Sequence, residues 1–263
     1  MNEISWDNIE PMKIEPIPAF TDNYIWLVQT SNGGTYVIDP GDAGPVVSLM
    51  KERNLGLDGI LVTHWHPDHT GGIQALKAAT GCTVWGPDNP AIEGIDHRVI
   101  DGDNVELDGL IFSVMAVPGH TLDHIAYYGH GVLFCGDTLF VAGCGRVFEG
   151  TFPMMRASLE RIRELPSDTH IYCTHEYTAA NLKFALAVDP ENHALQEQEQ
   201  SCRQHRQEQQ PTVPSTLAKE RASNPFLRWD DPVIINNLAA HKKLVGSNPD
   251  DVFEALRTWK DNF

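Results

Sequence analysis

Four side chains that can bind a metal ion lie within a six-residue stretch, at His64, His66, Asp68 and His69. The apolar run before them, residues 59–62, predicts a buried strand, and a helix is expected to begin near Asp68. Across such a turn, His64 and His66 can point one way while Asp68 and His69 face another. A tetrahedral zinc ion takes three or four protein ligands, so donors on two faces indicate a pair of metal ions. A polar surface loop is the alternative interpretation.

Three further polar residues, far apart in the sequence, each come after an apolar run that predicts a strand. A rigid scaffold positions the loops at its strand ends, and these loops often carry function. One such residue alone is more commonly structural than functional, so the indication of metal ligands comes from the joint pattern. The three residues are His120, Asp137 and His175.

The seven residues together resemble the ligand set of the metallo-β-lactamase superfamily, and within it that of the type II glyoxalases, the hydroxyacylglutathione hydrolases. The resemblance runs along the chain from residues 17–26 through 143–150 and 175–178 to 256–261. It implies a site for two divalent metal ions per chain. In that site one ion is bound by His64, His66 and His120, the other by Asp68, His69 and His175, and Asp137 bridges both.

The resemblance also implies the reaction: hydrolysis of S-(2-hydroxyacyl)glutathione thioesters, typically S-lactoylglutathione, in the second step of methylglyoxal detoxification. Zinc is the expected metal, although iron or manganese suits the same His and Asp ligands. A bound metal lowers the pKa of water from about 15.7 to about 7, so a metal-bridging hydroxide is the expected nucleophile. Asp68 and Asp137 are the expected catalytic carboxylates, and the sequence has no Gly-x-Ser-x-Gly motif for a serine nucleophile.

Cations near the end of the chain offer a way to hold an anionic substrate. Arg257 and Lys260 lie three residues apart on a predicted helix and therefore share one face. They could bind the carboxylates of glutathione, or they could compensate the dipole at a helix C-terminus. The substrate-binding residues that the resemblance implies are Arg146, Tyr177, Asn181, Arg257 and Lys260. Phe148 departs from eukaryotic members of the family, which often carry Tyr there, so no hydroxyl contact is expected from it.

Composition narrows the choice of partners. The net charge of −17, from 19 basic and 36 acidic residues, argues against nucleic acid, which needs clustered Lys and Arg. No run reaches the roughly 20 apolar residues of a membrane helix, and residues 1–7 lack the basic and apolar regions of a signal peptide. The five cysteines show no Cys-x-x-Cys spacing, which indicates reduced thiols. We therefore expect a cytoplasmic monomer that acts on a small-molecule glutathione thioester, with no membrane or nucleic-acid partner.

The hydrophobic pattern predicts an α/β fold followed by a helical segment. The expected strands are 14–19, 24–29, 35–38, 59–62, 83–85, 111–117, 125–128 and 132–134, with helices at 46–53, 72–79 and 154–164. This order matches the αβ/βα metallo-β-lactamase-like sandwich, two mixed sheets with outer helices, that the resemblance implies. Later helical patterns at 177–188, 191–210, 232–240 and 249–259 surround an irregular segment, 211–229. We therefore expect a dimetal hydrolase domain at residues 1–175 and a small helical substrate-binding domain at 176–263.

Two other functions fit parts of the pattern. One is a different hydrolase of the same superfamily, a nuclease or a lactamase, which the acidic charge and the pair Arg257 and Lys260 disfavour. The other is a non-enzymatic metal-binding protein. A further expectation concerns Asp39, in the sequence Val-Ile-Asp-Pro-Gly, which could accept a hydrogen bond from a ligand imidazole or could only form a turn.

Overall fold

The computed structural model describes residues 7–9 and 11–263. Residues 1–6, on which most of the signal-peptide argument rests, lie outside the described residues. The chain divides into two compact units. Unit 1 is Met1–Ala116 with Asp123–Gly136, and unit 2 is Val117–Leu122 with Asp137–Phe263. The expected functional division at residue 175 stays a prediction.

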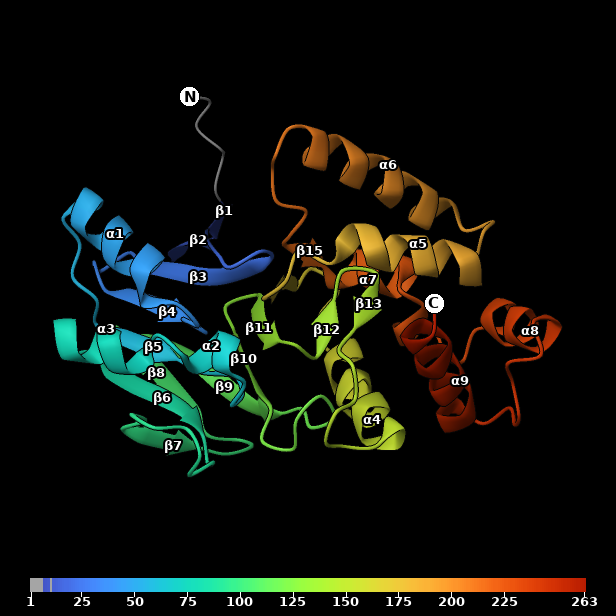
Figure 1. Ribbon diagram of the computed structural model, residues 1–263, viewed down its shortest axis with the longest axis horizontal. Helices are drawn as coiled ribbons and strands as arrows, with labels where there is room; N and C mark the ends of the chain where they lie inside the picture. The colour runs from blue at the N-terminus through green and yellow to red at the C-terminus, as the bar shows by residue number, and fades with distance from the viewer. Residues whose placement is uncertain (1–6, 10) are drawn as a thin grey trace. The chain divides into compact units, whose positions relative to one another are not determined.

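Unit 1 is built on a seven-stranded mixed sheet in which the strands follow one another in sequence order (Figure 1). The first four strands pair antiparallel and the last four pair parallel. Parallel neighbours need a long crossover connection, and helices supply it between the central strands. The strands are β1 (Asp7–Ile9), β2 (Met12–Ala19), β3 (Asn23–Thr30), β4 (Thr35–Ile38), β5 (Gly59–Leu61), β6 (Thr83–Pro87) and β7 (His97–Val99).

Three helices in the crossovers belong to this sheet: α1 (Ala43–Arg53), α2 (Pro67–Thr70) and α3 (Ile73–Thr80). Val46 and Met50 of α1 and Ile73 and Leu76 of α3 pack in one apolar core with residues of β2 to β6. The strand β3 is buried along almost its whole length, on both faces, as expected for a strand covered by helices on one side and a second sheet on the other. The predicted helix near residue 68 begins at Pro67, which is well suited to a first helical position.

A second, antiparallel set of strands completes unit 1, in the order β11-β10-β9-β8. In β9, buried Phe112 and Val114 alternate with exposed Ile111 and Ser113, so one face of this sheet is covered and the other is not. The hydroxyl of Tyr127 donates to the carbonyl of Val62 at 2.8 Å and ties this sheet to the first. The strands are β8 (Asn104–Leu107), β9 (Leu110–Ala116), β10 (Ile125–Gly129) and β11 (Val132–Gly136).

Unit 2 consists mainly of helices, with two short strand pairs. Its strands are β12 (Leu139–Phe140), β13 (Gly143–Cys144), β14 (His170–Cys173) and β15 (Ser215–Thr216), where β12 pairs with β13 and β14 with β15. Its helices are α4 (Phe152–Arg163), α5 (Thr178–Val188), α6 (His193–Gln207), α7 (Leu217–Ser223), the 3₁₀ helix η1 (Pro225–Leu227), α8 (Pro232–Ala240) and α9 (Pro249–Asp261). The rings of Phe184, Phe226 and Phe253 are fully buried between these helices.

The segment 211–229, expected to be irregular, contains β15, α7 and η1, so that expectation was wrong. The helix α7 begins where the Thr216 hydroxyl accepts a hydrogen bond from the Lys219 amide, a common N-terminal cap. Its apolar face is short, and its central position is occupied by a buried Glu220. A helix that buries a carboxylate gives no hydrophobic periodicity to recognise.

Among the helices of residues 11–263, none has the length and apolar character that a membrane crossing requires.

Unit 1 offers a test of the fold at Glu15, a buried carboxylate on β2. Burial alone would raise the pKa of Glu15, but hydrogen bonds from Lys13 and Arg53 outweigh it and leave the pKa below 4.5. A carboxyl group with a lowered folded pKa stabilises the fold above its unfolded pKa and loses that contribution as the pH falls. Near neutral pH, Glu15→Gln should therefore lower the free energy of unfolding by about 1–3 kcal/mol.

Urea unfolding curves measured near neutral pH and well below pH 4.5 would show whether the difference between wild type and Glu15→Gln disappears in acid. The exposed Glu106 on β8 provides the control, and Glu106→Gln should change stability little at either pH. A difference for Glu15→Gln that persists undiminished in acid would contradict the electrostatic explanation.

Candidate metal centre

In unit 1, the turn from β5 into α2 carries the four neighbouring ligand candidates, and they form two donor pairs. Nε2 of His64 lies 3.1 Å from Nδ1 of His66. Nε2 of His69 lies 3.4 Å from Oδ2 of Asp68. His64 and His69 are fully buried, whereas His66 and Asp68 are half-buried. The two pairs are not far apart, because the ring centroids of His64 and His69 are 4.0 Å from each other.

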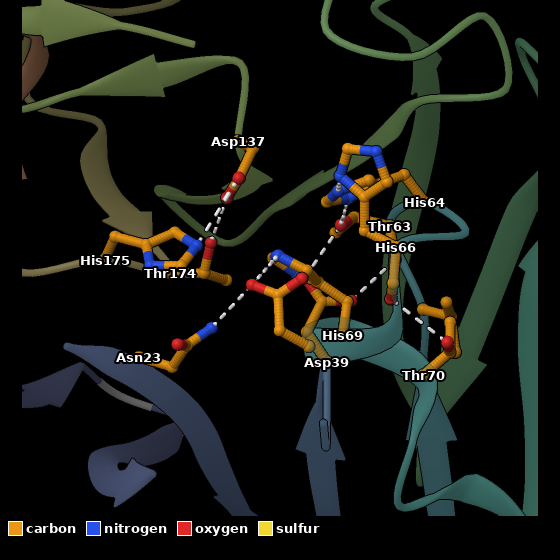
Figure 2. A network of polar contacts seen from close by, with 12 residues as sticks. Asn23, Asp39, Thr63, His64, His66, His69, Thr70, Asp137, Thr174 and His175 are labelled. Atoms are coloured by element: carbon orange, nitrogen blue, oxygen red, sulfur yellow. Dashed lines mark hydrogen bonds and ion pairs between the residues drawn. The ribbon is translucent and has the colours of Figure 1, made fainter. Parts of the chain in front are cut away.

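Asp39, directly after β4, accepts hydrogen bonds from Thr63 at the start of this turn (Figure 2). Its Oδ1 accepts the amide hydrogen of Thr63, and its Oδ2 accepts the hydroxyl hydrogen of Thr63, each at 2.7 Å. The Thr63 hydroxyl has one hydrogen, so it acts as an acceptor toward Nδ1 of His64, 3.0 Å away. The hydrogen of the His64 imidazole therefore lies on Nδ1, and the lone pair lies on Nε2.

The same carboxylate fixes a second imidazole. Oδ2 of Asp39 lies 3.1 Å from Nδ1 of His69, so the His69 hydrogen also lies on Nδ1 and its lone pair on Nε2. Asp39 therefore contacts the imidazole of His69, as expected, and the role of His69 as a metal ligand stays a prediction. The turn that follows packs tightly, because a Cβ on Gly41 would lie 1.9 Å from the carbonyl oxygen of Asp68.

Two further contacts in unit 1 were not predicted from the sequence. Asn23, the first residue of β3, donates its amide to Oδ2 of Asp68 at 3.0 Å. The ring of His124 stacks on that of His64, with centroids 4.5 Å apart, and it is buried. The sequence offers no signal for either contact, because both partners are distant along the chain.

Unit 2 contains the other three ligand candidates, and Asp137 lies between the two histidines. Its Oδ2 is 3.4 Å from Nε2 of His120 and 3.4 Å from Nε2 of His175. Its Oδ1 accepts the hydroxyl hydrogen of Thr174 at 2.6 Å (Figure 2). Nδ1 of His120 donates to the carbonyl of Arg146 at 2.7 Å, which places the His120 lone pair on Nε2. Unit 2 thus brings together residues that are 55 positions apart in the chain, from 120 to 175.

The donor atoms fit a divalent metal ion in type and spacing. Two donors on one tetrahedral ion, each about 2.0–2.1 Å from it, are about 3.3–3.4 Å apart. Within unit 1 the paired donors are 3.1 and 3.4 Å apart, and within unit 2 both separations from Asp137 are 3.4 Å. Imidazole and carboxylate are ligands of zinc, iron and manganese alike.

A thiolate ligand is not supported beside these residues. All five cysteines are buried and form no disulfide. Burial raises the pKa of Cys144 to about 11 and that of Cys173 to about 12. Within residues 7–9 and 11–263, no cysteine belongs to a group of side chains spaced to hold a metal ion.

Three of the expected substrate-binding residues are exposed or half-buried, and one of them, Tyr177, contacts a metal-ligand candidate of unit 2. The ring of Tyr177 stacks on that of His175 with centroids 4.6 Å apart. The guanidinium of Arg146 is exposed and lies over the ring of Phe148. Nζ of the half-buried Lys260 donates to the carbonyl of Ala180 at 3.1 Å, and burial lowers its pKa.

The other two are buried and contact main chain. Asn181 donates its amide to the carbonyl of Val141 at 3.1 Å. Nη1 of Arg257 donates to the carbonyl of Cys144 at 2.9 Å, and Nη2 donates to Asp261 at 3.0 Å. Their roles in substrate binding stay predictions.

The chain matches two family models. Residues 19–175 match the metallo-beta-lactamase superfamily, and residues 176–263 match the hydroxyacylglutathione hydrolase C-terminus. A hydroxyacylglutathione hydrolase of Chromohalobacter salexigens is 51% identical over 258 residues, covering 96% of this chain and 100% of the relative. Another from Pseudomonas fluorescens is 49% identical over 255 residues, with the same coverage.

Solved structures share the fold. A crystal structure of ETHE1 from Myxococcus xanthus superposes with a TM-score of 0.64 at 25% identity, covering 95% of this chain and 97% of that one. The B3 metallo-beta-lactamase BLEG-1 gives a TM-score of 0.62 at 23% identity, covering 82% of this chain and 99% of its own. These likenesses confirm the expected metallo-β-lactamase-like α/β fold.

The role of Asp39 can be tested by removing its charge and keeping its shape. Asp39→Asn can no longer accept hydrogen bonds on both sides, so the hydrogens of Thr63 and His69 lose their common acceptor. Loss of such a partner typically costs about 10–100-fold in metal affinity, and we expect a loss in that range. Competition with a chromophoric chelator for zinc would measure it.

Asp42, three residues away, gives the matched control. It caps α1 by accepting from the Gly44 amide at 2.8 Å, and Asn caps helices as well as Asp does. Asp42→Asn should therefore leave zinc affinity unchanged. Equal zinc affinities for Asp39→Asn and wild type would show that Asp39 serves only the turn.

Proposed function

Because the chain belongs to the hydroxyacylglutathione hydrolase family of the metallo-β-lactamase superfamily, we propose that it hydrolyses S-(2-hydroxyacyl)glutathione thioesters to glutathione and a 2-hydroxy acid. The observation that carries this assignment is the near-complete, roughly half-identical match to relatives of that name. S-Lactoylglutathione is the proposed typical substrate. A nuclease or a lactamase is not favoured, because residues 176–263 match the hydroxyacylglutathione hydrolase C-terminus and the similar relatives carry the name of that enzyme.

We propose that two divalent metal ions, zinc in the first instance, are bound by the seven predicted ligands. His64, His66 and His120 would hold one, and Asp68, His69 and His175 the other, with Asp137 bridging. The bridging role is supported by Asp137 Oδ2, which is equally distant from the two imidazole nitrogens of unit 2. Bound there, two such ions would supply Lewis acidity that activates water near neutral pH and polarises the acyl oxygen.

The two carboxylates Asp137 and Asp68 have different surroundings, which indicate different roles. Asp137 is nearly buried, and Thr174 occupies its Oδ1, so its role is to hold charge at a fixed place. Asp68 is more exposed, with 39% of its side chain accessible against 9% for Asp137. Asn23 anchors Oδ2 of Asp68. Asp68 is therefore the carboxylate that can orient the attacking water and accept its proton.

We propose that Arg146, Tyr177, Asn181, Arg257 and Lys260 form the glutathione site. Their gathering in unit 2 supports this, since Arg257 and Arg146 both approach Asp261. With a protein net charge of −17, an anionic substrate depends on such local positive charge. The match of separate family models to residues 19–175 and 176–263 supports a catalytic domain ending at 175 and a substrate-binding domain after it.

A monomeric, cytoplasmic enzyme is the proposed state. Five buried cysteines, none in a disulfide, agree with a reducing compartment. Size-exclusion chromatography of the purified protein would test the monomer.

The activity and the metal count can be tested together. Zinc-loaded protein should contain two ions per chain and hydrolyse S-lactoylglutathione, and a chelator should abolish the activity. Asp137→Ala removes the proposed bridging carboxylate, so it should lose metal and nearly all activity. Elemental analysis and a thioester hydrolysis assay would measure both quantities.

A fully active wild type with one ion per chain would contradict the two-metal mechanism. If Asp137→Ala kept both ions and more than about a tenth of the wild-type rate, a barrier change of only about 1.4 kcal/mol, the bridging role would be wrong.

Substrate binding can be separated from chemistry at Lys260, the half-buried cation of α9. A contact made equally in the ground and transition states changes KM and leaves kcat alone. Lys260→Ala should therefore raise KM for S-lactoylglutathione about ten-fold, the loss of one charge-assisted hydrogen bond of about 1.5 kcal/mol. Steady-state kinetics would measure both constants.

Lys243 is the matched control, because both cations lie over an aromatic ring of unit 2: Lys260 over Phe184 and Lys243 over Trp259. Lys243→Ala should leave KM unchanged. A thioester without the glutathione carboxylates should not distinguish Lys260→Ala from wild type. An unchanged KM for S-lactoylglutathione would leave Lys260 as a purely structural cation.

A further inference from the structure

The loop between Asp137 and Arg146 contains the β12–β13 pair and is called here the ligand hairpin. It begins with the carboxylate of Asp137 and ends with the carbonyl of Arg146, which accepts the hydrogen of His120 Nδ1 at 2.7 Å. The hairpin therefore carries one proposed metal ligand and sets the orientation of another. Its ends lie close together, because the amide of Gly145 donates to the carbonyl of Thr138 at 3.1 Å.

The helix α7 and the residue after it supply three of the side-chain contacts that hold the ligand hairpin, beside the hydrogen bonds of Asn181 to Val141 and of Arg257 to Cys144. The side-chain amide of Asn224 lies 3.1 Å from the carbonyl oxygen of Phe140 and 2.9 Å from that of Gly143. Oε2 of Glu220 accepts the amide hydrogen of Ala142 at 2.8 Å. Glu220 and Asn224 both have no exposed surface. Together they satisfy main-chain groups on both strands of the hairpin and at its tip.

The backbone of the hairpin tip needs such support. Ala142 has φ +53°, a left-handed conformation that costs a residue with a Cβ about 1–2 kcal/mol. Its buried amide would be expensive to leave without an acceptor. The carboxylate of Glu220 supplies that acceptor and so stabilises the left-handed backbone of the tip.

Burying the carboxylate of Glu220 costs free energy. Ser215 and Asn224 also donate to its carboxylate, at 2.6 and 3.0 Å, and burial raises its pKa. None of the hydrogen bonds recorded for Glu220 comes from Lys or Arg. Apolar residues of similar volume often stabilise a core as well as buried charged groups do. A buried Glu next to a buried Asn therefore points to a requirement for a specific backbone geometry.

We propose that Glu220 and Asn224 are positioning residues that hold the ligand hairpin so that Asp137 and His120 are pre-arranged for metal. The proposal rests on the metal site of the proposed function. It assigns to the helical part of the chain a second role beside substrate binding, because α7 lies in the segment after residue 175. The affinity for metal then depends on Glu220 and Asn224, which are not themselves among the residues proposed to bind it.

The first test compares zinc affinity in two variants and one control. Asn224→Ala removes the amide that serves the carbonyls of Phe140 and Gly143, and Glu220→Gln keeps the shape but removes one acceptor. Asn237→Ala is the matched control, because the Asn237 amide also donates to a main-chain carbonyl, that of Val188 at 2.9 Å, away from the hairpin. Chelator competition for zinc and the thermal midpoint of the metal-free protein would be measured for each.

Asn224→Ala should bind zinc about ten-fold more weakly or worse, and Glu220→Gln should show a smaller loss. Asn237→Ala should stay within about two-fold of wild type even if its thermal midpoint falls. Wild-type affinity in both α7 variants, or an equal loss in Asn237→Ala, would overturn the proposal. A wild type that binds no zinc would instead refute the metal site, and the positioning role with it.

A second measurement uses only the wild-type protein, so it does not depend on a variant that folds. Coupling between two sites is reciprocal: if the hairpin contacts favour metal binding, bound metal must favour the hairpin contacts. Hydrogen–deuterium exchange of the Ala142 amide should slow when zinc is added to metal-free protein. The region around Val188 and Asn237 should exchange at the same rate with and without zinc. Identical exchange of Ala142 in both states would overturn the proposal.

Discussion

An imidazole binds a metal ion only through a nitrogen that carries no hydrogen, and the proposed metal site depends on this requirement. For three of the five candidate histidines, a hydrogen-bond acceptor occupies the other nitrogen. Thr63 serves His64 and Asp39 serves His69 in unit 1, while the Arg146 carbonyl serves His120 in unit 2. The elements that supply these acceptors, the end of β4, the end of β5 and the β12–β13 loop, are held by contacts that the metal ligands themselves do not make.

The net charge of the chain gives the proposed substrate-binding cations a physical reason. The chain carries 17 more negative than positive charges, so a glutathione thioester gains nothing from the field of the whole protein. Arg146 and Arg257 approach the single carboxylate of Asp261, and Lys260 is held on the same helix, α9. Desolvation lowers the pKa of Lys260, which makes a bound anion a favourable partner for it. The aromatic surfaces of Tyr177 and Phe148, next to His175 and His120, add apolar area beside these two proposed metal ligands.

Much of this protein could be predicted from the sequence, because the information is local or periodic. The spacing of His64, His66, Asp68 and His69 follows from one turn, and the apolar runs around them predict strands of a sheet that the structure contains. The resemblance of the whole ligand set to one family led to the same assignment as the comparisons with known proteins. The five cysteines are free thiols in the structure, in agreement with their spacing, which offers no Cys-x-x-Cys motif.

Only the tertiary structure decided which groups support those ligands. Asn23 lies 45 positions from Asp68 and Asn224 lies 81 from Gly143, and no periodicity connects residues so far apart. The helix α7 was missed because it buries a carboxylate where a pattern search expects an apolar residue. Ligand types can be read from a sequence, because chemistry dictates them. Their orientation depends on hydrogen bonds between distant segments, and these exist only once the chain has folded.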